Sequence, residues 1–292
     1  MSAGPRVAYL GPPGTFSGDA LGAASRDDAH TAVAYATIAD ALRAVSEGRA
    51  ELGFVPLENS SEGSVRPTLD ALAFDVTELE IVGEYDHPIS QALIAAAPIE
   101  LAAIREVHSH PQAAAQCSRF LRERLPQALI VAAPSTADAI RGLEHGPGGR
   151  AALGAAGAAE LYGGSVLAAS VEDEPGNVTR FAWVAPAGFA VAPGAGRWRT
   201  TLIFAELGED RPGALVDALV EVSSRGVNMT RIESRPRRLG LGRYMFFVDL
   251  EGRAGEEPVE AAIAALRTQA ASVRILGSYP VESAGVPART RH

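Results

Sequence analysis

The first 185 residues alternate short apolar segments with polar loops and helix-forming segments, and this alternation limits the fold more than any other feature. The apolar segment Arg6–Leu10, for example, runs into the loop Gly11–Ser17, and an alanine-rich helix is expected from about Phe16. Alternating strands and helices predict an α/β fold with a mostly parallel sheet and helices on both faces. Ligands bind beyond the carboxyl ends of the strands in such sheets. We therefore expect a cleft where the polar loops meet.

Two lobes followed by a smaller domain are predicted from the order of the segments. The extended segments Ile81–Tyr85 and Ile89–Ala96 would carry the chain into a second lobe, and Asn177–Val184 would return it. The expected divisions are a large domain over 5–185, with lobes of about 5–80 plus 170–185 and of 81–169, a linker over 186–199, a small domain over 200–281 and a disordered tail over 282–292. The β-α-β-β-α-β order within 200–281 predicts a ferredoxin-like unit.

Composition excludes several classes of protein. All 26 basic side chains are arginines, so enzymes that need a lysine, such as Schiff-base enzymes and P-loop NTPases, do not fit. Cys117 is the only cysteine, which excludes intramolecular disulfides and cysteine-rich metal sites and suits a reducing cytoplasm. The net charge of −9 argues against a nucleic-acid binder. We find no apolar segment typical of a signal peptide or membrane span, and expect a cytoplasmic protein without a membrane partner.

Two loops concentrate hydrogen-bonding side chains. Thr15 and Ser17 lie where a glycine-rich loop enters a helix, a place that can hold an anion or can simply be a tight turn. Glu58–Ser61 places four hydrogen-bonding side chains in one loop, and capping the following helix needs only one of them. The surplus in the second loop favours a binding role.

The segment around His108, His110 and Cys117 invites two other interpretations. The two histidines lack a third ligand placed by the sequence, so we expect no metal site. Cys117 falls inside a helix expected from Pro111 to about Arg124, where a buried, unreactive thiol is commoner than a nucleophile.

Side chains alternate between the two faces of a strand, and this matters for Asn177–Phe181. Asn177 and Thr179 are expected to face one way and Arg180 the other. The segment is either part of a site or an ordinary edge strand.

Six motifs in the same order make the chain resemble the prephenate dehydratases. They are GPPGTFS (Gly11–Ser17), PLENSSEGSV (Pro56–Val65), SHPQAAAQC (Ser109–Cys117), NVTRF (Asn177–Phe181), and GALV (Gly213–Val216) and ESRP (Glu233–Pro236) of the family's ACT regulatory domain. The resemblance covers about residues 5–282 and leaves no room for a fused chorismate mutase domain. Gly18-Asp19 departs from the family's usual helix start, and Ala114 replaces a bulkier apolar residue.

The resemblance implies a catalytic domain of two lobes, similar to type II periplasmic binding proteins, plus the ACT domain. It implies conversion of prephenate to phenylpyruvate, water and carbon dioxide without a metal or cofactor. It also implies that L-phenylalanine acts as an effector at an interface between subunits of a homodimer or homotetramer.

The resemblance also assigns residues. Thr179 would donate a hydrogen bond to the leaving hydroxyl, and Glu58 is the alternative acid if it is buried enough to keep a proton. The residues expected to bind substrate are Thr15, Ser17, Asn59, Ser60, Ser109, Gln112, Asn177 and, if it faces the cleft, Arg180. The residues expected to bind the effector are Gly213, Ala214, Leu215, Val216, Glu233, Ser234 and Arg235.

Two other functions remain open at this point. The loops do not distinguish prephenate from arogenate, which would give phenylalanine directly. A two-lobed fold can also bind a ligand without catalysis.

Overall fold

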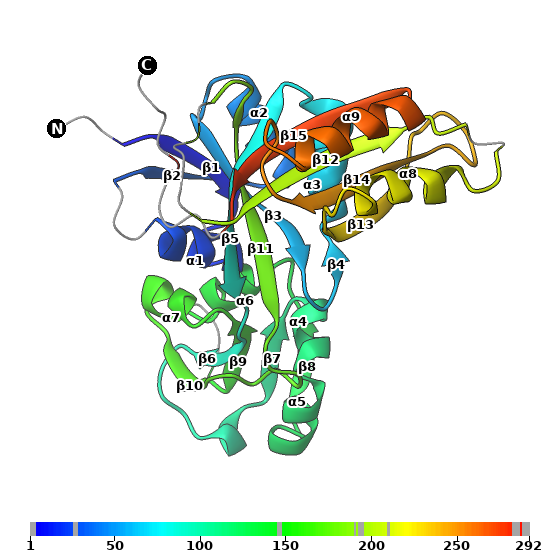
Figure 1. The fold of residues 1–292 in the computed structure, drawn as a ribbon. Coiled ribbons are helices and arrows are strands. Elements are labelled where there is room, and N and C mark those ends of the chain that lie inside the picture. Colours follow the sequence, from blue (N-terminus) through cyan, green and yellow to red (C-terminus); the bar gives the residue numbers. More distant parts are fainter. Residues whose placement is uncertain are drawn as a thin grey trace.

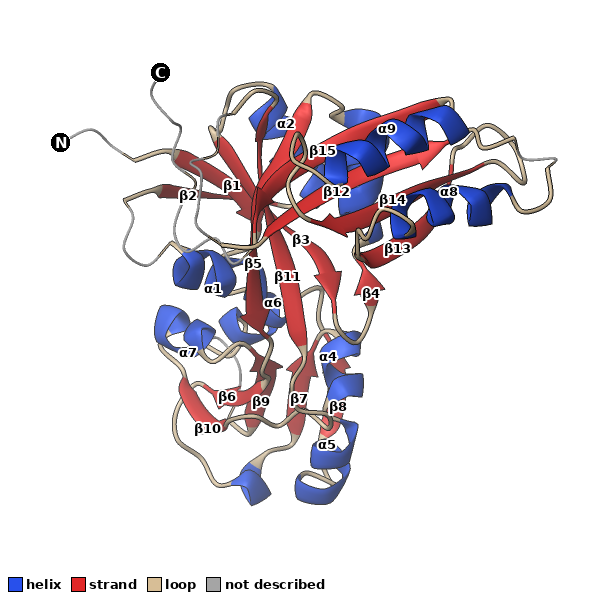
Figure 2. Ribbon diagram, in the orientation of Figure 1, coloured by secondary structure: helices blue, strands red, loops and turns tan. Residues whose placement is uncertain are grey.

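Three β-sheets organise the computed structural model, which describes residues 4–25, 29–144, 148–189, 191, 196–208, 211–281 and 287 (Figures 1 and 2). The second lobe lies below the first in these views, and the third sheet extends to one side of the first. The α/β class and the ferredoxin-like unit are confirmed. The expected tail falls outside the described residues except at position 287, as do positions 190 and 192–195 of the expected linker. No helix within the described ranges is long and apolar enough to cross a bilayer.

The first sheet has the strand order β2-β1-β3-β11-β5, with β4 paired to β3. The strands are β1 (Arg6–Leu10), β2 (Thr31–Tyr35), β3 (Leu52–Asn59), β4 (Gly63–Ser64), β5 (Leu79–Pro88) and β11 (Val178–Pro186), and the helices are α1 (Phe16–Ala24), α2 (Ile38–Ser46) and α3 (Arg66–Asp70), which continues as a π-helical turn over Ala71–Asp75. β1 runs parallel to β2 and β3, whereas β11 is antiparallel to β3 and β5. β2, β1, β3 and β5 thus run in one direction, so the sheet is mostly parallel as expected, and the exceptions are the two-residue β4 and β11, which returns the chain from the second lobe.

The second sheet, of order β10-β6-β9-β7-β8, forms the other lobe. Its strands are β6 (Ala92–Ala95), β7 (Glu106–Ser109), β8 (Leu129–Ala132), β9 (Arg150–Gly154) and β10 (Ser165–Ala168), with helices α4 (Pro111–Gln116), α5 (Ser118–Arg124), α6 (Thr136–Arg141) and α7 (Gly157–Tyr162) and a 3₁₀ turn over Leu101–Ala103. The boundary expected near residue 80 falls inside β5, which pairs with β11 along its whole length, so the crossover follows Pro88. The single helix expected over 111–124 is broken at Cys117, whose backbone leaves the helical region.

The third sheet is antiparallel throughout, in the order β13-β14-β12-β15. Its strands are β12 (Trp198–Ala205), β13 (Met229–Pro236), β14 (Tyr244–Glu251) and β15 (Ser272–Pro280), and its helices are α8 (Ala214–Ser223) and α9 (Val259–Gln269). The two helices cover one face, and the other face packs on the first lobe. Met245, Phe247 and Leu276 of this sheet join Leu72 and Ile81 of the first lobe in one hydrophobic cluster.

Local sequence explains where the helices begin. Thr15 and Thr37 accept hydrogen bonds from the backbone amides of Gly18 and Asp40, which cap α1 and α2. Ser135 caps α6 in the same way through the Asp138 amide. The Gly18-Asp19 departure leaves the start of α1 unchanged, because Thr15 supplies the cap and Phe16 begins the helix.

Candidate active site

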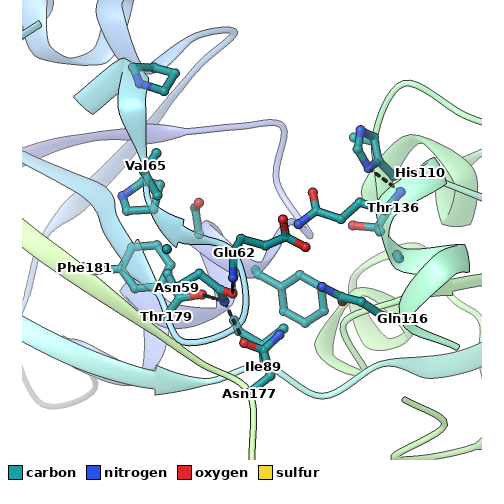
Figure 3. A pocket seen from close by; sticks show the side chains of 18 of the residues that line it. Asn59, Glu62, Val65, Ile89, His110, Gln116, Thr136, Asn177, Thr179 and Phe181 are labelled. Atoms are coloured by element: carbon teal, nitrogen blue, oxygen red, sulfur yellow. Dashed lines mark hydrogen bonds between the residues drawn. The ribbon is translucent and has the colours of Figure 1, made fainter. Parts of the chain in front are cut away.

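A cavity of about 550 Å³ lies between the two lobes and is lined by residues of both (Figure 3). The first lobe supplies Phe16, Ser17, Pro56, Asn59, Glu62, Gly63, Ser64, Val65, Arg66, Pro67, Thr179 and Phe181, the second supplies Gln91, His110, Gln112, Ala113, Gln116, Pro134, Ser135 and Thr136, and the connecting segments supply Ile89 and Asn177. Five of the predicted substrate-site residues are therefore brought together: Ser17, Asn59, Gln112, Asn177 and Thr179.

Asn59 fixes the polar centre of this cavity. Its Nδ2 donates to Oδ1 of Asn177 at 2.7 Å and to Oγ1 of Thr179 at 2.9 Å. Its Oδ1 accepts from the backbone amides of Ser61 and Glu62 at 2.9 and 3.0 Å. Because these amides hold the oxygen, the nitrogen must point at Thr179 (Figure 3).

Thr179 is left with a hydroxyl proton to donate. Its oxygen accepts from Asn59, and the described residues offer its O–H no acceptor. Thr179 is 8 % exposed and lies on the cavity wall beside Phe181. A hydroxyl that already accepts one hydrogen bond is oriented to donate its own proton into the cavity.

Two features of the cavity wall can attract an anion. Arg66 begins α3, is exposed, and forms no ion pair within the described ranges. Ser17, in the first turn of α1, lies where unpaired backbone amides attract anions. Arg66 was not among the predicted site residues, although it follows the PLENSSEGSV motif directly and is the first cation after it.

Three predicted residues support the wall of the cavity without lining it. The hydroxyl of Thr15 donates to the carbonyls of Leu10 and Pro12 and caps α1. The Ser109 hydroxyl is buried and donates to the carbonyl of His110 at 3.0 Å. Ser60 donates to Oδ1 of Asn177 at 3.2 Å and accepts from the Val178 amide.

Glu58 and Arg180 lie on the opposite face of the sheet. Arg180 Nη2 contacts Glu58 Oε2 at 2.6 Å and Asp249 Oδ2 at 2.7 Å. Neither residue lines the cavity, which corrects the expectation that they contact substrate. The physical reason is the alternation of side chains along β3 and β11, which sends Asn59 and Thr179 one way and their neighbours the other.

The histidine pair and the cysteine have other roles. His110 Nδ1 accepts from the Gln112 amide at 3.3 Å and caps α4, and His108 contacts Glu106 at 3.0 Å. Within the described ranges no three histidine, cysteine or acidic side chains lie close enough to hold a metal. Cys117 is fully buried, and burial raises the pKa of its thiol to about 12.

A second cavity, of about 300 Å³, lies in the third domain. Gly213, Ala214, Leu215 and Val216 line it together with Tyr244, Phe246 and other residues of β12 to α8. Glu233, Ser234 and Arg235 do not line it, because they lie on the edge strand β13. Arg235 instead contacts both carboxylate oxygens of Asp70 in the first lobe at 2.7 Å.

Comparisons with known proteins agree across the whole chain. The family model described as prephenate dehydratase matches residues 7–188, and the ACT domain model matches residues 201–268. A prephenate dehydratase of Mycolicibacterium smegmatis is 41% identical over 296 residues, covering 97% of this chain and 93% of the relative.

Two solved structures are similar to this chain over most of its length. The prephenate dehydratase of Arthrobacter aurescens, solved in complex with L-Phe, has a TM-score of 0.85 at 38% identity and covers 97% of this chain and 92% of its own. GqqA, described as a novel type of quorum quenching acylase, has a TM-score of 0.84 at 34% identity and covers 94% of this chain and 98% of its own.

Proposed function

The chain belongs to the prephenate dehydratase family, and from this premise we propose how the cavity between the lobes carries out the reaction. Prephenate carries two carboxylates and a ring hydroxyl. Loss of carbon dioxide and of the hydroxyl from opposite ends of the ring gives phenylpyruvate and makes the ring aromatic, which supplies the driving force. The protein must therefore stabilise a departing hydroxyl and anchor the side-chain carboxylate.

Thr179 is the group proposed to act on the leaving hydroxyl. The single observation that carries this role is that Asn59 donates to its oxygen, so its own proton is free to bind the departing oxygen. A threonine hydroxyl is too weak an acid to give up the proton outright. It acts instead as an oriented donor of the kind that stabilises charge as it develops.

Arg66 and the first turn of α1 are proposed to anchor the carboxylates of the substrate. Arg66 supplies a full charge, and Ser17 and the first turn of α1 supply neutral donors. Gln112 reaches the cavity from the second lobe, so a substrate held by Arg66 and Gln112 bridges both lobes. Glu62, not Glu58, is the carboxyl group on the cavity wall and takes over as the alternative acid.

Control by L-phenylalanine is proposed for the third domain. The GALV residues line a cavity, whereas Glu233 and Ser234 lie on β13, whose outer edge pairs with no other described strand. A site that uses both motifs is therefore completed by a second chain set against that edge. Exposed apolar side chains of α8 and β13, among them Val216, Val220 and Ile232, support a homo-oligomer formed there. We place this oligomer in the cytoplasm.

Product analysis tests the proposed reaction. The purified chain is incubated with prephenate and, separately, with arogenate, and the products are identified. Phenylpyruvate from prephenate is expected. If only arogenate were converted, giving phenylalanine, arogenate would be the substrate instead of prephenate. If either compound bound without being converted, the protein would be a ligand-binding protein and not an enzyme. An N-acylated amine serves as the control substrate, because the GqqA structure is described as an acylase.

Titration calorimetry with L-phenylalanine tests the proposed control. One molecule bound per chain is expected. Absence of binding heat would remove the third domain from any regulatory role.

A further inference from the structure

A buried group of charges joins the catalytic strand to the third domain, on the face of β11 away from the cavity. Arg180 of β11 contacts Glu58 of β3 at 2.6 Å, Glu84 of β5 at 3.5 Å and Asp249 of β14 at 2.7 Å. The Asp249 side chain is 0% exposed and that of Arg180 is 9% exposed. Every strand of the first sheet that flanks β11 therefore supplies one partner, and the third domain supplies another.

Asp249 is held in turn by its own domain. Arg231 of β13 contacts both of its oxygens, at 2.9 and 3.1 Å. Thr201 of β12 donates to its Oδ1 at 2.7 Å, and Tyr279 of β15 contacts the Thr201 hydroxyl at 2.7 Å. The other three strands of the third sheet thus each supply one residue that fixes the carboxylate of Asp249, directly from β12 and β13 and through Thr201 from β15.

Arg180 and Thr179 are neighbours on opposite faces of β11. Thr179 is paired with Asn59 and Arg180 with Glu58 in the ladder with β3. The register shifts directly after Arg180, where Phe181 is opposite Pro56. A bulge frees side chains from the regular ladder and changes where they point. Arg180 is therefore held at the last regular pair before the bulge, on the opposite face of the strand from its neighbour Thr179.

β14 connects this point to the cavity of the third domain. Tyr244 and Phe246 of β14 line that cavity, and Asp249 follows three residues after Phe246. Phe246 and Val248 belong to the helix-covered face, whereas Phe247 belongs to the cluster shared with the first lobe. A ligand at Phe246 that shifted β14 as a rigid strand would move Asp249 with it.

We propose that Arg180 is a positioning residue, and that its ion pair with Asp249 transmits the state of the third domain to Thr179. The proposal rests on the proposed function and specifies its regulation. Stability alone does not explain the pair, since buried ion pairs are often no more stable than packed apolar side chains. The pair instead joins β11, which lines the cavity between the lobes, to β14, which lines the cavity of the third domain.

The test compares the phenylalanine response of variants, defined as the ratio of kcat/KM with and without saturating L-phenylalanine. The variant Asp249→Asn keeps the shape of the side chain and removes its charge. The matched control is Glu221→Gln, which breaks the ion pair of Glu221 with Arg225 on the outer helix of the same domain. Calorimetry measures L-phenylalanine binding in each variant.

For Asp249→Asn we expect the response to fall to within about twofold of 1 while the Kd for L-phenylalanine changes less than about threefold. Without L-phenylalanine, we expect its kcat to fall about tenfold with little change in KM, because Thr179 acts in the transition state. Glu221→Gln keeps the wild-type response. A purely structural role would lower the unfolding free energy and leave the response intact.

Three results would overturn the proposal: a wild-type response in Asp249→Asn, loss of L-phenylalanine binding in that variant, or an equal loss of response in Glu221→Gln. If Asp249→Asn does not fold, the same test is made with Thr201→Val, which keeps every charge and removes one hydrogen bond to Asp249. A reduced response then supports the connection and an unchanged response refutes it. A wild-type chain without turnover or without any response would instead refute the proposed function.

Discussion

Thr179 owes its proposed role to the hydrogen bond that it accepts from Asn59. Replacing Thr179 by Val keeps its shape and removes the donor, so kcat should fall about 10²- to 10³-fold, the usual effect of losing one oriented donor. Thr179→Ser keeps the hydroxyl and should retain most of the activity. Steady-state rates with prephenate measure both. Equal activity of the Val and Ser variants would remove Thr179 from the mechanism.

Glu84 gives the chain a specific dependence on pH. Burial raises the pKa of Glu84 from 4.5 to about 8, with Asp86 and Asp249 acting in the same direction and Arg180 and Arg197 opposing it. Arg199 Nη1 also contacts its carboxylate at 2.7 Å. The folded protein keeps a proton that the unfolded chain releases, so stability is lost as pH rises between these two values.

The variant Glu84→Gln isolates this effect. Between about pH 5 and pH 8, the free energy of unfolding of the wild type should fall as the pH rises. This fall should be steeper than that of the variant by up to about 1.4 kcal/mol per pH unit. Urea unfolding at several pH values measures the difference. If the unfolding free energies of the wild type and the variant changed with pH in the same way, Glu84 would be ionised over the whole pH range.

Residue identities in the cavity were predictable only where a motif marks them. Ser17, Asn59 and Thr179 lie in recognisable motifs, and the structure places them together. Glu58 lies in the same motif as Asn59 but contacts Arg180, which in turn contacts Asp249, 191 positions from Glu58 in the chain. No local pattern indicates such a distant contact. Arg66 was missed because a single arginine at a helix start has many other uses.

At the scale of single elements, capping side chains determine where some of the helices begin. Thr37 and Ser135 are of the residue types that cap helices, and each accepts a hydrogen bond from a backbone amide of the first turn. The extent of β5 was not predictable, because its last residues are strand only by pairing with β11. The break at Cys117 was hidden by a run of alanines that fits any helical face.

Gly277 makes the contact between β15 and β5 possible. A Cβ at this position would lie 2.1 Å from the carbonyl oxygen of Ile81, a backbone atom that cannot turn aside. Gly277→Ala should therefore destabilise the protein by about 3 kcal/mol or more. Gly22→Ala is the control, because a Cβ there meets nothing within 4 Å and the residue lies inside α1. It should stabilise the helix by about 0.5–1 kcal/mol.

Urea unfolding measures both glycine variants. A Gly277→Ala protein as stable as the wild type would mean that the two strands separate without cost.

At the scale of the whole molecule, the apolar clusters do not follow the domain boundaries. One cluster contains residues of the first lobe and of the third domain, whereas the second lobe has two clusters of its own. One of these consists largely of alanines, such as Ala139, Ala152 and Ala158, which bury little apolar surface. The order of domains followed from the sequence, but the way the third sheet packs on the first lobe did not, since no periodicity encodes a contact between distant sheets.

Hydrogen exchange on the full chain should show this division. Amides of β7, β8 and β9 should open at lower free energy than those of β3, β11 and β12, because the second lobe has the smaller core. Exchange at one common free energy in all three sheets would show that the chain opens as a single unit.

The shared cluster also bears on how such chains diverge. Exchanging the third domain for that of another enzyme would remove Met245 and Phe247, and Leu72 and Ile81 of the first lobe would lose the side chains that cover them. Recombination at the segment between the domains therefore yields a working hybrid only when the underside of the incoming sheet is complementary to its new host. The third domain is therefore inherited together with the first lobe and is not exchanged between enzymes as an independent module.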